Sequence, residues 1–60
     1  MSLNELLATM QNEMFSASEE LEKFMNGNKS AGTRVRKNMQ NIKTVAQNVR
    51  QEVQEMKNNS

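Results

Sequence analysis

The sequence lacks Cys, His, Pro, Trp and Tyr, and it contains only two Phe among 60 residues. The absence of Cys and His removes disulfides, thiolate nucleophiles, imidazole bases and the usual ligands of zinc. The absence of Pro removes the residue that most strongly interrupts a helix. We therefore predict a protein that is not an enzyme and that uses no metal, no other cofactor and no small-molecule substrate.

Bulky apolar residues are also scarce. Leu, Ile, Val and Phe together number eleven, and no apolar run approaches the roughly 20 residues that span a bilayer. The N-terminus lacks the charged and apolar segments of a secretory signal peptide. We expect one cytoplasmic domain over residues 1–60 with no membrane partner. So short a chain buries too small a fraction of its surface to be stable alone, which predicts self-association.

The net charge of +1 conceals two unlike halves. Residues 1–28 carry five Glu and one Lys, a net charge of −4, whereas residues 29–60 carry seven Lys or Arg and two Glu, a net charge of +5. The division falls at Asn26-Gly27-Asn28, an internal cluster of turn-forming residues. A Gly at this position suits the left-handed conformation that ends many helices. We predict a turn at residues 26–28.

Each half contains an unbroken seven-residue apolar repeat. The seam positions are Leu3, Leu7, Met10, Met14, Ala17, Leu21 and Phe24 in the first half, and Val35, Met39, Ile42, Ala46, Val49, Val53 and Met56 in the second. Alternating steps of four and three residues are typical of coiled-coil helices. Ser2 and Glu5 have the spacing of a capping box. We predict an all-α fold in which helices 2–25 and 29–57 form an antiparallel hairpin, a two-helix coiled coil.

Pairing the seams outward from the turn sets Phe24 against Gly32. Gly32 either makes room for Phe24 or only frays the start of the second helix. Four apolar residues lie outside the seam: Leu6, Phe15, Met25 and Val45. We expect these four to be exposed on one hairpin and covered by a second hairpin in a dimeric four-helix bundle. Three Asn are expected to be solvated without a role: Asn12, Asn41 and Asn48.

The second helix carries a column of cations spaced seven residues apart. This basic column consists of Lys29, Arg36, Lys43, Arg50 and Lys57. In the predicted register the facing flank of the first helix has no carboxylate, because Glu13 and Glu20 lie on its other flank. The column is therefore either open to an external anion or paired with Glu13 and Glu20 of a partner chain. Both interpretations stay open at this point.

The segment Gly27 to Lys37, Gly-Asn-Lys-Ser-Ala-Gly-Thr-Arg-Val-Arg-Lys, resembles the chlamydial histone-like family, bacterial proteins likened to linker histones. The likeness continues through Ile42, Ala46 and Arg50. It implies a nucleoid-associated protein that binds DNA without sequence preference. With the basic column, it indicates a DNA-binding set of Lys29, Arg34, Arg36, Lys37, Lys43 and Arg50.

Chlamydial members continue into a long tail rich in Lys and Ala, whereas this sequence ends in Lys57-Asn58-Asn59-Ser60. We therefore expect it to correspond to the helical, self-associating part of such proteins, a short form without the tail. The leading hypothesis is a homodimer of the bacterial nucleoid whose second helix contacts DNA phosphates. The alternative is a non-enzymatic oligomerisation or adaptor bundle with no nucleic-acid role.

Overall fold

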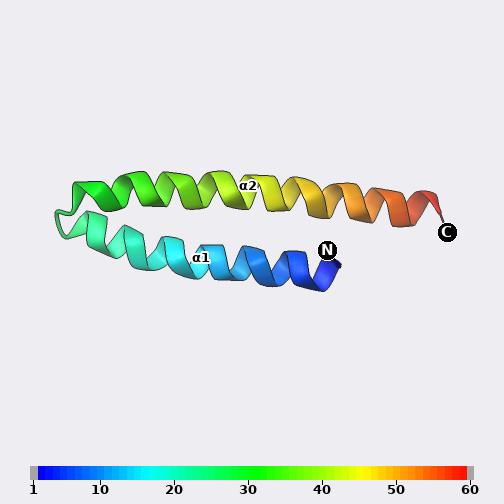
Figure 1. The fold of residues 1–60 in the computed structure, drawn as a ribbon, viewed down its shortest axis with the longest axis horizontal. Helices are drawn as coiled ribbons and strands as arrows, with labels where there is room; N and C mark the ends of the chain where they lie inside the picture. The colour runs from blue at the N-terminus through cyan, green and yellow to red at the C-terminus, as the bar shows by residue number, and fades with distance from the viewer. Residues whose placement is uncertain (1, 60) are drawn as a thin grey trace.

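The computed structural model describes residues 2–59, which form two helices, α1 (Leu3–Met25) and α2 (Lys29–Asn58). The helices lie side by side and antiparallel, and α2 extends beyond the start of α1 (Figure 1). The resulting rod measures 50 × 15 × 13 Å. The predicted all-helical hairpin is confirmed, and neither helix differs from its expected bounds by more than one residue at either end.

The first helix begins at the predicted capping box. Ser2 Oγ accepts a hydrogen bond from the Glu5 backbone N–H at 3.2 Å, and the Glu5 carboxylate accepts one from the Ser2 backbone N–H at 3.3 Å. These two bonds satisfy donors that would otherwise be orphaned at the helix start. The hydrogen bonds from the backbone and side chain of Ser2 also hold the pKa of Glu5 below its usual range.

The turn has the geometry that the Asn-Gly-Asn sequence predicts. Gly27 adopts a φ of 105°, a left-handed conformation that other residues reach only with strain. Its N–H bonds the Phe24 carbonyl, and the N–H of Asn28 bonds the Lys23 carbonyl, as in a Schellman motif. Asn28 then caps α2, because its side-chain oxygen accepts from the Ala31 N–H at 3.3 Å.

Gly32 has a packing role beside this turn. A Cβ placed on Gly32 would lie 2.9 Å from both Cδ1 and Cε1 of Phe24, closer than van der Waals contact permits. The absence of a side chain therefore lets the Phe24 ring lie against α2. This contact supports the interpretation that Gly32 makes room for Phe24. It also confirms the prediction that these two residues face each other beside the turn.

The interior between the helices differs from the predicted seam. Leu6 is 4% exposed and Val45 is half-buried, so the expectation that both would be exposed is wrong. Phe15 and Met25, 68% and 76% exposed, agree with that expectation. Within residues 2–59 the other buried apolar residues are Ala17 and Ala31.

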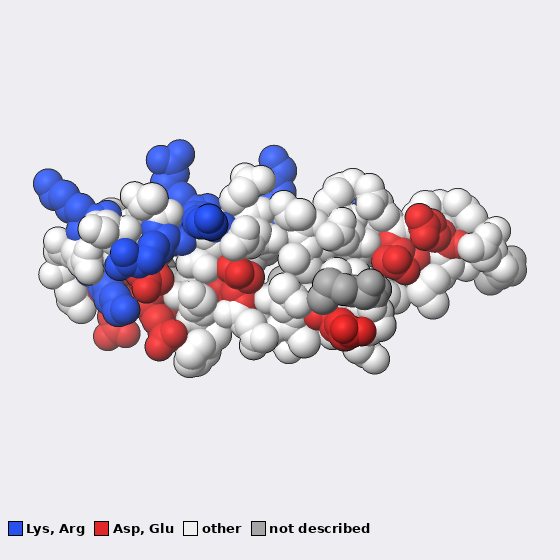
Figure 2. Space-filling view, viewed as in Figure 1, with Lys and Arg blue, Asp and Glu red and all other residues white. Residues whose placement is uncertain are grey.

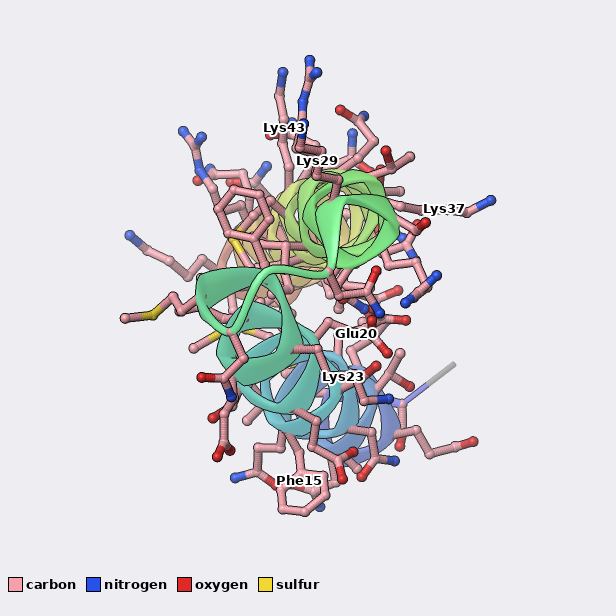
Figure 3. All side chains as sticks on the ribbon, turned by 90° about the vertical axis from the view of Figure 1, so that its left-hand side faces the viewer. Phe15, Glu20, Lys23, Lys29, Lys37 and Lys43 are labelled. Carbon is pink, nitrogen blue, oxygen red and sulfur yellow. The ribbon has the colours of Figure 1, made fainter. Side chains whose placement is uncertain are left out.

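The two helices are rotated away from the alignment that the seam predicts. The contact line of α1 includes Leu6, Glu13 and Glu20, each one residue before a seam position. Six seam residues are left 43–54% exposed and form what we call the apolar face: Leu7, Met14, Leu21, Phe24, Met39 and Val53. Figure 3 shows Met sulfur atoms on the side of the helix pair opposite Glu20 and Lys37. The hairpin thus has one apolar side and one polar side.

Candidate nucleic-acid interface

The basic column lies along the outer surface of α2. Lys29, Arg36, Lys43 and Arg50 are all exposed, and Lys29 and Lys43 project from α2 away from α1 (Figure 3). Seven residues make almost two helical turns, so successive members lie on one flank about 10.5 Å apart along the axis. Lys29 and Arg36 border the same shallow hollow as Leu21 and Phe24, which places the column beside the apolar face.

Most of the predicted DNA-binding cations form no salt bridge with another residue that the structure describes. In the part of the chain that the structure describes, no salt bridge involves Lys29, Arg36, Lys37, Lys43 or Arg50. For the cations from Lys29 to Arg50, this agrees with the prediction that the column does not form an intramolecular zipper with α1. An exposed cation without an internal partner is available to an external anion.

Arg34 is the exception among the predicted site residues. Its Nε donates a 2.5 Å hydrogen bond to the Glu20 carboxylate, which also accepts one of 3.4 Å from Lys23 Nζ. The Arg34 bond, chiefly, holds the pKa of Glu20 below its usual range. The Arg34 side chain is still 49% exposed, so an anion can approach its remaining nitrogens.

The polar side of the hairpin contains a hydrogen-bonded cluster around Glu13. Asn38 Nδ2 donates to one carboxylate oxygen of Glu13 at 2.7 Å and approaches Ser16 Oγ at 3.4 Å, while Asn41 Nδ2 donates to the other carboxylate oxygen at 3.2 Å. Asn38 is buried, and its Oδ1 has no partner among the described residues. We call this side, with the Glu20–Arg34 pair, the polar edge.

The polar edge corrects one expectation and adds a residue that the sequence reasoning missed. Asn41 is half-buried and bonded to Glu13, so the prediction of a solvated Asn41 without a role is wrong. Asn38 was not singled out as an interface residue. A pattern in the sequence could have identified it. Ala31, Asn38 and Val45 are spaced seven residues apart and so lie on one flank of α2, the flank of the apolar Val45 that the predicted seam left out.

The charges are separated over the molecular surface. Figure 2 shows Lys and Arg side chains over the turn end and along the upper edge of α2, with Glu along α1 and towards the C-terminal end of α2. From Lys29 to Arg50 the column extends about 32 Å along the helix axis. This arrangement suits a long polyanion rather than a single small anion, because the cations do not converge on one point.

Other kinds of site have less support in the described residues. No group of three or more His, Cys, Asp or Glu within residues 2–59 could hold a metal ion. Neither helix, over those same residues, combines the length and apolar character that crossing a membrane requires.

A family model described as Histone H1-like protein Hc1 matches residues 4–59, nearly the whole chain. This match confirms the resemblance drawn from the Gly27 to Lys37 segment. No curated protein and no solved structure gave a significant match.

Proposed function

The chain belongs to the Histone H1-like protein Hc1 family, and on that premise we propose that it is a DNA-binding protein of the bacterial nucleoid. The observation that carries the proposal is the row of exposed cations from Lys29 to Arg50 on α2, none of which forms a salt bridge with another described residue. The proposed contacts come from Lys29, Arg34, Arg36, Lys37, Lys43 and Arg50. In this proposal these side chains bind DNA phosphates and do not distinguish between DNA sequences.

The four cations of the column from Lys29 to Arg50 form the main contact in this proposal. They follow one flank of α2, whereas Lys37 projects to another side of the helix (Figure 3), and Arg34 already donates to Glu20. A straight helix and a winding DNA backbone stay close over only part of the column. Two or three simultaneous phosphate contacts per chain are therefore expected, which gives a salt slope near −2 to −3 at about −0.9 per contact.

Phosphate binding is favoured over base recognition by the kind of side chain available. The column consists of long, exposed Lys and Arg side chains, and the aromatic residues of the chain are only Phe15 and Phe24. Phe15 lies on the side of α1 away from α2 (Figure 3), and half of Phe24 is covered. Phe24 lies near the first cations of the column but packs against Gly32, so the column has no row of exposed rings on which successive bases could stack. In this proposal the binding unit is a homodimer, which doubles the few contacts that one chain offers.

The test is a fluorescence-anisotropy titration of two unrelated duplexes at several salt concentrations. We expect equal affinities for the two sequences and a log–log slope between −2 and −3 per chain engaged. Absence of binding at about 50 mM salt, or an affinity that does not change with salt, would contradict the proposal.

A matched pair of variants assigns the binding to the column. Lys43→Gln removes a column cation, whereas Lys23→Gln makes the same chemical change at an exposed Lys on α1 that already contacts Glu20. Loss of one phosphate contact should lower affinity roughly tenfold at 50 mM salt and reduce the slope by about 0.9. Lys23→Gln should change affinity little. Equal losses for both variants would show that only net charge matters.

The adaptor alternative makes a different prediction for the same surface. In that hypothesis Glu13 and Glu20 of a neighbouring chain pair with the column, but both carboxylates here bind donors of their own chain. The combined variant Lys43→Glu with Arg50→Glu separates the two functions. Loss of DNA binding by an intact oligomer supports the nucleoid proposal, whereas loss of the oligomer itself supports the adaptor.

A further inference from the structure

The outer side of α2 has a polar repeat of which the proposed cation contacts use only every second member. Four residues after each of the first three cations of the basic column stands a neutral side chain that can donate a hydrogen bond. The alternating series, which we call the donor ridge, is Lys29, Thr33, Arg36, Gln40, Lys43, Gln47 and Arg50. Steps of four and three residues keep all members on one side of the helix. Every member is exposed, and the labelled Lys29 and Lys43 project away from α1 (Figure 3).

The neutral members of the donor ridge keep their donors available. Within residues 2–59, no hydrogen bond involves the side chain of Thr33, Gln40 or Gln47. Thr44, beside the ridge, differs, because its hydroxyl already donates to the Gln40 carbonyl at 3.1 Å. Gln40 and Gln47 also border the same shallow hollow as Lys43. An anion bound by the Lys43 ammonium would therefore have an amide donor on either side of it along the helix.

The same stretch of α2 has no carboxylate. No Asp or Glu occurs from Lys29 to Gln51, and the first acid of the helix is Glu52. Exposed helices commonly place Glu three or four residues from Lys or Arg, because such pairs stabilise the helix. The ridge positions beside the cations hold Thr and Gln instead. A carboxylate at these positions would repel a phosphate, whereas a hydroxyl or an amide can bind one.

The spacing of the donor ridge suits a chain of phosphates better than the spacing of the cations alone. Successive cations lie about 10.5 Å apart along the helix axis, whereas the phosphates of one DNA strand advance about 3.4 Å each along the duplex. Phosphates that lie between two bound cations would thus have no partner. The neutral member divides each interval into steps of about 6 and 4.5 Å. It therefore offers a donor to a phosphate between the two that the cations bind.

We propose that Thr33, Gln40 and Gln47 bind DNA phosphates in addition to the cations, so that the DNA backbone follows the donor ridge where helix and duplex stay close. This inference rests on the proposed function and adds three neutral residues to its contact. Each neutral residue donates a hydrogen bond to a phosphate oxygen. The salt slope counts the phosphates that cations neutralise, so the neutral contacts raise affinity without changing the slope. Experiment can therefore separate the two kinds of contact.

Anisotropy titrations of Gln47→Ala with two unrelated duplexes, over a range of salt concentrations, test the neutral contacts. We expect affinity to fall about threefold to tenfold at every salt concentration, with the slope of the parent protein, because no cation is lost. The control is Gln51→Ala, the same change at an exposed residue of α2 that shares its hollow with Glu52 and Glu55. It should bind as the parent does. Equal affinities for the two variants would overturn the inference, and a loss confined to one duplex would indicate base recognition instead.

A gain of charge on the donor ridge provides a second measurement. Gln47→Lys places a cation where the ridge meets the DNA backbone, so the salt slope should steepen by about 0.9 and affinity at low salt should rise. Gln51→Lys adds the same charge four residues before Glu55, a spacing at which the two side chains can pair on the helix surface. It should steepen the slope less. A slope for Gln47→Lys equal to that of the parent would overturn the placement of the backbone along the ridge.

Failure of the donor ridge and failure of the proposed function give different results. If the parent chain binds no DNA, or binds it without salt dependence, the proposed function fails and this inference fails with it. If the parent binds and Lys43→Gln lowers the slope, while Gln47→Ala binds as the parent does, only the donor ridge is overturned. Circular-dichroism melts of each variant check the fold. They should match the parent, because the replaced Gln side chain is exposed and makes no hydrogen bond within residues 2–59.

Discussion

The two sides of this hairpin differ in the contacts that their side chains make. On the polar edge, Glu13 and Glu20 accept hydrogen bonds from Asn38, Asn41 and Arg34 across the helix pair. On the apolar face, half-exposed Leu and Met side chains project without covering. The contrast teaches that the rotation of the helices follows the polar contacts as well as the apolar repeat.

The physical reason is the narrowness of an interface between two helices. One helix can bury only a thin stripe against one other helix. The apolar stripe of α1 is wider than one partner helix can cover, because it includes Leu6 on one flank and Leu7 on the other. Turning the Leu6 flank inward also brings Glu13 within reach of amide donors on α2. The Leu7 flank is then left for another partner.

The largest expected effect comes from comparing the two adjacent leucines. Leu6→Ala removes a side chain that is 4% exposed and should lower the free energy of unfolding by about 2–3 kcal/mol at any protein concentration. Leu7→Ala removes one that is 46% exposed and should cost about 1 kcal/mol in the hairpin, with a loss that grows as concentration favours the dimer. Urea denaturation at low and high protein concentration measures both. A Leu7→Ala loss equal to that of Leu6→Ala in dilute solution would remove the distinction between the two flanks.

A smaller effect is expected from the polar edge. Asn38→Ala deletes the donor to Glu13 and should destabilise the fold by about 1–2 kcal/mol, since the acceptor is a carboxylate. Asn48→Ala makes the same change at an exposed residue of the same helix and should stay within about 0.5 kcal/mol of the parent. Both substitutions raise helix propensity equally, so the difference between their denaturation midpoints reports the contact. No difference would show that the Glu13 cluster contributes nothing to stability.

The smallest effect is expected from the pH dependence of the Glu20 contact. Because Arg34 holds the pKa of Glu20 below its ordinary value of 4.5, the folded protein binds this proton less readily than the unfolded chain. The pair therefore stabilises the fold above about pH 4.5, and that contribution disappears as the pH falls through the lowered value. Thermal melts between pH 3 and 7 should show a shallower acid loss for Glu20→Gln. Glu19→Gln removes a neighbouring charge outside the Arg34 contact and should keep the slope of the parent protein.

Features that depend on neighbouring residues were predictable from the sequence. Ser2 and Glu5 cap α1, and Gly27 adopts the left-handed turn, because both depend on local backbone geometry. The Phe24 and Gly32 contact followed as well, since the turn fixes which residues meet beside it. Farther from the turn, the side of each helix that faces its partner depends on competing long-range contacts. Leu6, Asn38 and Asn41 were misjudged or missed for that reason.

The candidate site also combines a feature that the sequence predicts with one that depends on the packing of the helices. The spacing of the basic column is a property of the sequence, because seven residues always return to nearly the same side of a helix. The engagement of Arg34 by Glu20 is not, since those residues are far apart along the chain and meet only when the helices pack. The sequence placed Arg34 outside the column but among the six candidate DNA-binding cations, and the structure adds that Arg34 is already bonded to Glu20.

By itself, the sequence determined two helices, their turn, the row of cations on α2 and the presence of more apolar surface than one hairpin can bury. These follow from backbone geometry, helical periodicity and composition, which act locally along the chain. Only the tertiary structure decided which flank of the apolar stripe is enclosed. That choice is a balance between burying Leu6 and satisfying the Glu13 carboxylate, and it exists only once both helices are in contact.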